Sequence, residues 1–411
     1  FMKKVIGSYA ISMIIDNDKE NIYCLKKESP LVIGSSSNTN MVASDIRAIL
    51  KYTNKYYILD DFEYAKISAK TINIYNIEGK IVTKELKEYQ EEVNDTDKGH
   101  YKHYMMKEMT EQKDTIYNTC LPFIEDGINS LLKMPILTKY KNIDIVGCGT
   151  AYHAGLVAEY LFRELTNTRC NTYLASEYRY QNNFLSKDTL TIFISQSGET
   201  ADTIAALKLV KENNCPSLGI INVKESSMTF LVDECLYTKA GSEIAVASTK
   251  AYTAQVALLS LLVLSHGYRN KTISKEKVLE VINEFKNIKD IITPLLSKRN
   301  IYQKIAKSIY KDEDIFYIGR GLDYALSMEG SLKLKEISYI HSESYASGEL
   351  KHGTISLIKK NTKVFSSATN DKLNSKTISN LKEVISRGAK VYLITDSDYK
   401  DSSFTIINIP K

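Results

Sequence analysis

Short apolar runs separated by polar turns make up the first ninety residues. The runs are rich in β-branched and aromatic residues, which favour strands, and they cover residues 5–15, 31–33, 56–59 and 71–75. Clusters of Gly, Ser, Asn and Asp lie between them, as is typical of turns. This part of the chain therefore predicts hairpins or a meander. Residues 85–97 are charged and carry no apolar periodicity, so we expect a linker there.

After residue 142 the pattern changes to a buried strand, a glycine-containing turn and a helix, repeated along the chain. Apolar runs predict strands at residues 142–147, 189–195, 217–223 and 234–238, with helices at 152–165, from 201 to about 211, and at 247–265. A charged, helix-favouring segment covers residues 271–299, and further strands are expected at 314–319, 363–367, 390–395 and 405–409. Alternating strands and helices predict parallel sheets with helices on both faces. We therefore expect two copies of one α/β unit.

Composition excludes several classes of protein. With 43% hydrophobic and 25% charged residues in 411, the chain is neither disordered nor fibrous. Its net charge of +5 is small for this length, and only 8 of its 54 basic residues are Arg, so we expect no nucleic-acid partner. No apolar run reaches the roughly 18 residues of a membrane span. The six cysteines are scattered without a CxxC pair, which is typical of reduced thiols in a cytoplasmic protein.

The most informative motif is the turn that follows the strand at residues 189–195. It contains the hydroxyls of Ser195, Ser197 and Thr200 and leads directly into a helix, whose unpaired N–H groups and dipole attract anions. Gly198 allows close approach of the backbone to a bound group. The motif has no lysine and matches neither nucleotide-binding glycine pattern, so it favours a sugar phosphate. The alternative is an ordinary Ser/Thr helix cap. A weaker version, ending in Thr150, follows the strand at 142–147.

A second group of candidates carries acid–base chemistry. Glu329, Lys333 and Glu336 stand at i, i+4 and i+7, which places them on one face of a predicted helix. The alternative is a solvated, salt-bridged stripe. His352 lies in a loop between glycines, as expected of a positioned acid–base residue that titrates near neutrality. The alternative is an exposed surface His with no role in the reaction. The pair His100 and His103 lacks a third ligand, so we expect no metal site.

Three blocks, in this order, resemble the glutamine–fructose-6-phosphate aminotransferase (isomerizing) family: residues 195–202 (SQSGETAD), 245–250 (AVASTK) and 332–341 (LKLKEISYIH). Residues 7–10, 29–34 and 43–45 resemble the second half of its glutaminase domain, and residues 97–99 with 104–108 resemble the connection that follows. The resemblance implies an α/β fold with two tandem sugar-isomerase (SIS) domains of parallel sheet, preceded by a partial β-rich, Ntn-type glutaminase domain. The implied boundaries are 1–93 for the glutaminase-type part, 94–125 for a linker and lead-in helix, 126–270 for the first SIS domain and 271–411 for the second.

The resemblance also implies a reaction. The family converts fructose 6-phosphate and glutamine to glucosamine 6-phosphate and glutamate, the first step of amino-sugar synthesis, without a metal or organic cofactor. By this resemblance Glu336 moves a proton between C1 and C2, Lys333 offsets the developing oxyanion, and His352 opens the sugar ring. Because the family supplies this His from the neighbouring subunit, we expect a homodimer. The substrate-binding residues are expected to be Ser195, Gln196, Ser197 and Thr200 for the phosphate, and Thr150 and Ser248 for the sugar.

The sequence departs from the family at both ends. The N-terminal cysteine nucleophile with its glutamine-binding motifs, and the C-terminal tail with a Schiff-base lysine, have no counterpart here. We therefore expect a central fragment that does not hydrolyse glutamine, and the amination step stays open. Two other functions stay open as well. A fructosamine-6-phosphate deglycase has a similar two-domain body, but needs nothing like residues 1–90. A non-catalytic sugar-phosphate sensor would not depend on Glu336.

Overall fold

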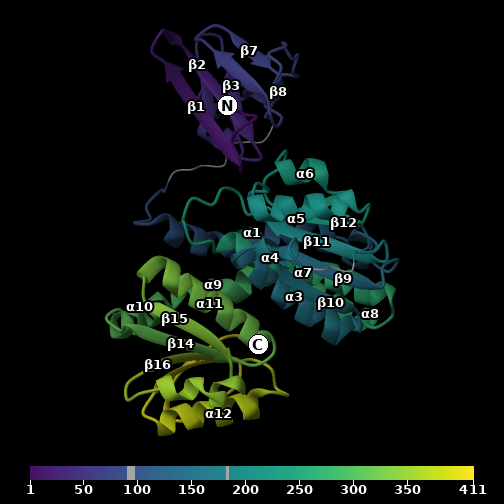
Figure 1. Ribbon diagram of the computed structural model, residues 1–411. Coiled ribbons are helices and arrows are strands. Elements are labelled where there is room, and N and C mark those ends of the chain that lie inside the picture. The colour runs from purple at the N-terminus through teal and green to yellow at the C-terminus, as the bar shows by residue number, and fades with distance from the viewer. Residues whose placement is uncertain (90–97, 182–184) are drawn as a thin grey trace. The chain divides into compact units, whose positions relative to one another are not determined.

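The computed structural model describes residues 1–89, 98–181 and 185–411, and the chain divides into two compact units, residues 1–97 and 98–411 (Figure 1). The predicted linker at residues 85–97 lies mostly outside the described residues, since it is described only as far as residue 89. No helix among the described residues combines the length and apolar character that crossing a bilayer requires.

The first unit consists of two antiparallel four-stranded sheets, which confirms the predicted hairpins. One sheet contains β1 (Tyr9–Ile15), β2 (Asp18–Lys27), β6 (Tyr64–Ile67) and β7 (Ile72–Tyr75). The other contains β4 (Asn40–Ala43), β3 (Val32–Ser35), β5 (Lys55–Ile58) and β8 (Lys87–Glu88), with a short 3-10 helix η1 at Ile46–Ala48. A small apolar core that includes Cys24, Ile33 and Leu59 holds the unit together.

The second unit contains two parallel five-stranded sheets with the same topology. Their strand orders are β10-β9-β11-β12-β13 and β15-β14-β16-β17-β18, so the second strand of each repeat lies at one edge and the first lies next to the third. The first sheet is built of β9 (Asn142–Gly147), β10 (Arg169–Leu174), β11 (Thr189–Ser195), β12 (Ser217–Ile221) and β13 (Glu234–Tyr237). The second is built of β14 (Asp314–Gly319), β15 (His341–Ala346), β16 (Lys363–Ala368), β17 (Lys390–Thr395) and β18 (Phe404–Asn408). This confirms the prediction of two copies of one α/β unit, called here the first and second α/β repeats.

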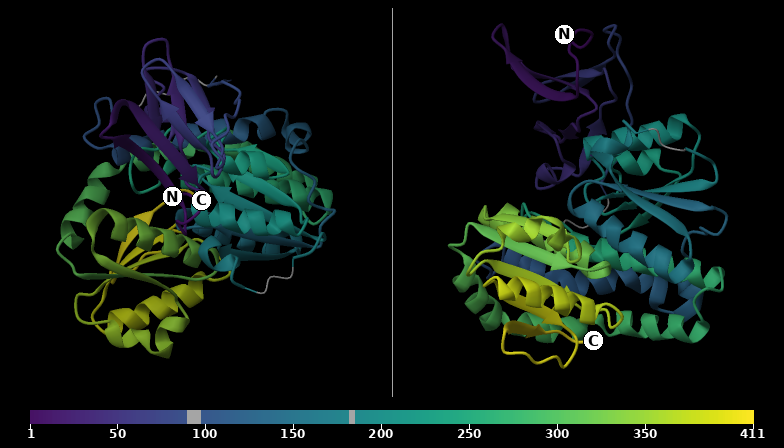
Figure 2. Two further views of the ribbon diagram at one scale, coloured as in Figure 1. Left: turned by 45° about the horizontal axis from the view of Figure 1, so that its top comes forward. Right: turned by 60° about the horizontal axis from the view of Figure 1, so that its bottom comes forward.

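Helices lie on both faces of the parallel sheets (Figures 1 and 2). The first repeat carries α1 (Tyr104–Ile124), α2 (Gly127–Leu131), α3 (Thr150–Thr166), α4 (Ala175–Tyr178), α5 (Ala201–Glu212), α6 (Ser227–Leu231) and α7 (Lys250–Arg269). Side chains alternate along the buried strand β11: Ile192 joins the core under α1, α3 and α7, whereas Phe193 joins the core under α4, α5 and α6. The long helix α7 packs against both α1 and α3.

The charged segment predicted at residues 271–299 is helical, and its helices extend to residue 309. It comprises α8 (Lys275–Lys286), α9 (Ile288–Ser297) and α10 (Arg299–Ile309). The second repeat then adds α11 (Leu322–Ser338), α12 (Asn374–Ser386) and the 3-10 turns η2 (Glu349–His352) and η3 (Thr354–Leu357). Helix α11 packs against α3, so the two repeats meet through corresponding helices.

The repeats agree in local detail at their first strand–helix junctions. Gly149 and Gly321 stand immediately before α3 and α11, with φ/ψ of 53/−123° and 61/−127°. Both helices have 17 residues, and a residue in the left-handed conformation ends each of them. The backbone at these junctions uses positive φ, which glycine adopts without steric cost. Two segments about 170 residues apart thus fold in the same way.

Candidate active site

In an open parallel sheet with this strand order, ligands bind beyond the carboxyl ends of the first and third strands, where the direction of the connections reverses. In the first repeat these strands are β9 and β11, which pair directly with one another. Strand β9 runs into the turn that ends in Thr150, and β11 runs into the turn at residues 195–200. A contact of 3.8 Å between Cys148 Sγ and Thr203 Oγ1 joins the first connection to the first turn of α5, the helix that follows the second. The two sequence motifs therefore lie at one edge of one sheet.

The turn after β11 is held in shape by its own hydroxyls. Ser195 Oγ accepts a hydrogen bond of 2.9 Å from the Gly198 N–H and lies 3.2 Å from Thr200 Oγ1. Ser197 Oγ accepts a hydrogen bond of 3.1 Å from the Glu199 N–H. Gly198 has a φ of +70°, and a Cβ there would lie 1.9 Å from Ser226 Oγ. Only glycine fits this position, because the turn packs closely against Ser226.

The simple helix-cap interpretation of this turn is wrong. Thr200 precedes α5, but its side chain makes no capping hydrogen bond to that helix. The first N–H groups of α5 therefore receive no acceptor from the capping residue, and the positive end of the helix dipole stays available to an anion. Gln196, the fourth predicted phosphate contact, is half-buried in the same turn, and its carbonyl accepts from the Asn222 N–H at 3.3 Å.

A second cluster joins the two repeats. Thr150, the first residue of α3, donates from Oγ1 to Glu329 Oε1 on α11 at 3.0 Å. Lys333 Nζ donates to the same Thr150 oxygen at 3.0 Å. It also lies 3.4 Å from Glu329 Oε1 and 2.6 Å from Glu336 Oε2. His153, one turn after Thr150, places Nδ1 2.7 Å from Glu329 Oε2. The structure thus brings together Thr150, Lys333 and Glu336, three of the candidate site residues.

The two carboxylates of this cluster differ in their surroundings. The Glu329 side chain is 7% exposed and is surrounded by Thr150, His153 and Lys333. The Glu336 side chain is 31% exposed, and its ion pair among the described residues is with Lys333. Glu329 is therefore held on several sides, whereas Glu336 is the more accessible of the two carboxylates. The alternative of a solvated, salt-bridged stripe is wrong for this helix face, because Glu329 is buried.

Ser248 lies half-buried in the loop that precedes α7. Two carboxylates anchor this loop through its backbone. Glu108 Oε1, on α1, accepts from the N–H groups of Ile244 and Ala245 at 2.7 and 3.0 Å. Glu243 Oε1 accepts from the N–H of Thr249 at 2.8 Å. The position of Ser248 is thereby set from both sides of the loop.

Glu108 makes this anchor dependent on pH. Burial raises the pKa of its carboxyl, and its second oxygen, Oε2, is buried without a hydrogen-bond partner among the described residues. The folded chain therefore binds the proton of the Glu108 carboxyl more tightly than the unfolded chain does. The contribution of Glu108 to the free energy of unfolding therefore declines as the pH rises from the ordinary value of 4.5 through the raised pKa.

Two substitutions test the anchor. We expect Glu108→Gln, which keeps the accepting oxygen, to gain stability relative to the parent as the pH rises through that window. Glu108→Ala leaves two backbone N–H groups without an acceptor and should lower the free energy of unfolding by about 1–3 kcal/mol. Urea unfolding between pH 4 and 8 measures both effects. Equal pH profiles for the parent and Glu108→Gln would contradict the assignment.

His352 is not part of the cluster within this chain. It ends the turn η2 and is exposed, and no hydrogen bond or ion pair joins it to any residue in the described ranges. Within residues 1–89, 98–181 and 185–411, which include His100 and His103, no group of three or more His, Cys, Asp or Glu side chains is placed to hold a metal ion.

Sequence reasoning missed four residues of this region. Glu329 was identified as part of a helix face, but not as the anion that Thr150 and His153 bind. His153 was detectable, since it stands three residues after Thr150 on the same helix face. Tyr252 was not considered. Burial, together with the negative charge of Glu329, raises the pKa of its phenol. Glu108 is more than 130 residues from the loop it anchors, so no local signal marks it.

Comparison with known proteins agrees with this geometry. The SIS domain family model matches residues 136–265 and 308–403. A glutamine–fructose-6-phosphate aminotransferase [isomerizing] of Caldanaerobacter subterraneus is 45% identical over 397 residues, covering 95% of this chain and 65% of that protein. One of Clostridium tetani is 41% identical over 418 residues, covering 100% and 69%. The solved C-terminal domain of the Francisella tularensis glucosamine-fructose-6-phosphate aminotransferase matches with a TM-score of 0.73 and 38% identity over 77% of this chain and 91% of that one. The chain thus spans about two thirds of the length of these full-length relatives.

Proposed function

The chain belongs to the glutamine–fructose-6-phosphate aminotransferase (isomerizing) family, and from this we propose that it binds fructose 6-phosphate and carries out the ketose-to-aldose isomerisation in the synthesis of glucosamine 6-phosphate. In the family reaction, glutamine supplies the amino group and leaves as glutamate. The observation that carries the proposal is the Lys333 side chain, which comes from the second repeat and lies against both Thr150 of the first repeat and Glu336.

We assign the phosphate to the turn after β11. The hydroxyls of Ser195, Ser197 and Thr200, with Gln196, surround the N-terminus of α5, where backbone N–H groups and the helix dipole favour an anion. The site offers hydroxyls in place of a lysine, which suits a sugar phosphate. We assign Thr150 and Ser248 as hydroxyl partners for the sugar.

We assign the chemistry to α11. Glu336 takes a proton from one of the carbons C1 and C2 and returns it to the other, which requires one carboxylate that reaches both. Lys333 lies 2.6 Å from that carboxylate and stabilises the negative charge that develops on the sugar oxygen. Glu329, held by Thr150 and His153, orients Lys333. No metal or organic cofactor enters these steps.

We also propose an identity for the remaining parts. Residues 1–93 correspond to the C-terminal part of a glutaminase-type domain, and residues 94–125 to a linker and lead-in helix. Residues 126–270 and 271–411 correspond to the two SIS domains. A cytoplasmic location is supported by the six cysteines, all of which are free thiols.

A homodimer in which each subunit lends His352 to its neighbour is the remaining part of the proposal. It is supported by the exposed position of His352 in the described chain. We expect Glu336→Gln and His352→Ala each to lose nearly all deuterium exchange at C1 of fructose 6-phosphate. When the two variants are unfolded and refolded together, about half of the dimers contain one chain of each kind, and each of these has one complete site. The mixture should therefore regain about a quarter of the parent exchange rate. Refolding each variant alone is the control. A mixture as inactive as its components would show that His352 does not act in the partner subunit.

Product analysis tests the function directly. Fructose 6-phosphate is incubated with the chain in deuterium oxide, and incorporation of deuterium at C1 is followed by nuclear magnetic resonance, with and without ammonia. We expect exchange at C1, and glucosamine 6-phosphate wherever amination also proceeds. If the chain converts fructosamine 6-phosphate but does not exchange deuterium at C1 of fructose 6-phosphate, it is a deglycase. If it binds fructose 6-phosphate without any deuterium exchange, it is a sensor.

A further inference from the structure

The second repeat has its own version of the edge at which the first repeat is proposed to bind phosphate. Its first and third strands, β14 and β16, are paired neighbours, and their carboxyl ends lead into α11 and α12. The first of these connections is Gly319-Arg320-Gly321, in which Arg320 takes the place that Cys148 has in the first repeat. The same topology therefore presents a second ligand-binding edge, with a cation where the first has a thiol.

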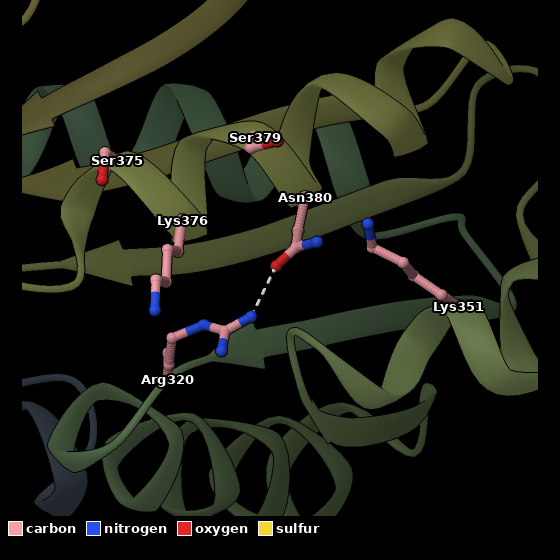
Figure 3. Close-up of a pocket in the computed structure, with 6 residues that line it drawn as sticks. All are labelled: Arg320, Lys351, Ser375, Lys376, Ser379 and Asn380. Carbon is pink, nitrogen blue, oxygen red and sulfur yellow. Dashed lines mark hydrogen bonds between the residues drawn. The ribbon is translucent and has the colours of Figure 1, made fainter.

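A cavity of about 300 Å³ lies at this edge, lined by Arg320, Lys351, Ser375, Lys376, Ser379 and Asn380. Figure 3 shows the amino groups of Lys376 and Lys351 on either side of the Arg320 guanidinium, which points to Asn380. Ser375 and Lys376 belong to the first turn of α12, a helix of 13 residues, so the positive end of its dipole adds to the three cations. The hollow is open to solvent and its lining is entirely polar, which suits a small, charged ligand and not an apolar one.

The positive charge of this cavity is largely uncompensated. Arg320 Nη2 donates to the neutral amide oxygen of Asn380 at 2.9 Å, and Asn380 itself is buried. Arg320 Nε is buried and has no hydrogen-bond partner among the described residues. Lys376 forms no ion pair within the described chain. Of the three cations, Lys351 alone meets a carboxylate of the described residues, Glu383 at 2.6 Å.

An anion with several acceptor oxygens satisfies these groups together. Phosphate accepts from the planar fork of an Arg and from Lys ammonium groups at once, and the hydroxyls of Ser375 and Ser379 offer further donors. None of the six lining residues is aromatic, so nothing stacks on a nucleobase. The volume leaves room for a small polar group beyond the phosphate itself.

We propose that this cavity of the second repeat binds the phosphate monoester of a small polar metabolite, at a site separate from the one at the turn after β11. The lining contains no carboxylate, so the site binds and does not transfer protons. It adjoins the turn η2, since Lys351 lines the cavity and His352 follows it directly. Occupancy of this site is thereby positioned to affect the segment that carries His352.

Titration calorimetry of the full 411-residue chain with glycerol 3-phosphate, which has no carbonyl group to isomerise, tests the proposal. We expect two sites per chain. Lys376→Gln should weaken one of them by about tenfold or more, as loss of a charge-assisted contact does, and Arg320→Gln should weaken the same one. The paired replacement Ser197→Ala/Thr200→Ala should weaken only the other. Lys376 is exposed, so its variant stays informative even if Arg320→Gln fails to fold.

Lys382→Gln is the matched control, because it removes one positive charge from α12 at a position outside the cavity. We expect it to leave both sites unchanged. A single site that responds only to Ser197→Ala/Thr200→Ala would overturn the proposal, and so would equal losses in Lys376→Gln and Lys382→Gln. Inorganic phosphate forms the second arm of the experiment: if it binds the Lys376-dependent site as tightly as glycerol 3-phosphate, the site takes a bare anion and the monoester assignment is wrong.

Discussion

Glu336→Gln is expected to slow deuterium exchange at C1 of fructose 6-phosphate by a factor of about 10² to 10⁴, the usual contribution of a general base. The amide has nearly the shape of the carboxylate but cannot accept the proton. Its position one turn after Lys333 and its partial exposure leave it the one carboxylate of the cluster with room for a substrate. Binding of fructose 6-phosphate should change only slightly, because the phosphate is assigned to the turn after β11.

Glu280→Gln is the matched control for Glu336→Gln. Glu280 is 61% exposed and, among the described residues, pairs with Lys277 on the surface of α8, so its loss removes one negative charge without touching the cluster. We expect parent-like exchange in that variant. Parent-like exchange in Glu336→Gln as well would remove Glu336 from the chemistry, and a large loss of binding would make it a binding residue.

Lys333→Met is expected to have two separable effects. Lys333 lies between two carboxylates, one of which is almost fully buried, so its loss leaves Glu329 and Glu336 without their shared cation. We expect the free energy of unfolding to fall by about 2 kcal/mol, less than for a fully buried pair because Glu336 remains partly exposed. Exchange at C1 should fall about 10²- to 10³-fold, as when one oxyanion donor is removed.

A double variant separates the two effects. Adding Glu329→Gln to Lys333→Met removes the buried charge that had lost its partner, so urea unfolding should show much of the stability restored while exchange stays low. Lys335→Met, on the exposed face of the same helix, should match the parent in both measurements. Recovery of both stability and exchange in the double variant would mean that Lys333 acts only through folding.

Much of this fold follows from local patterns in the chain. Apolar runs marked the central strands of both repeats, and the glycines and hydroxyls after them marked the turn at residues 195–200. The edge strands β10 and β15 escaped prediction, because their sequences, RCNTYL and HSESYA, are mostly polar and form no apolar run. The strands at the opposite edges, β13 and β18, coincide with the runs expected at 234–238 and 405–409, so the polar composition of β10 and β15 hides them and not their edge position.

In the candidate site, too, the sequence predicted contacts within one helix but not contacts between helices. The helical spacing of Glu329, Lys333 and Glu336 predicted a common face, and the structure confirms it through the contacts of Lys333. The hydrogen bond from Thr150 to Glu329 joins residues 179 positions apart, and only the packing of α3 on α11 brings them together. The periodicity of a single segment does not predict a contact between two helices so far apart in the chain. The glycines at 149 and 321 indicate only that α3 and α11 start in the same way.

A structure of the chain with fructose 6-phosphate bound would locate the phosphate and the reacting carbons directly. We expect the phosphate within about 3 Å of the hydroxyls of Ser197 and Thr200, and the Glu336 carboxylate within about 3–4 Å of C1 and C2. A phosphate held elsewhere, or a sugar whose C1 and C2 lie out of reach of Glu336 in every subunit, would contradict it.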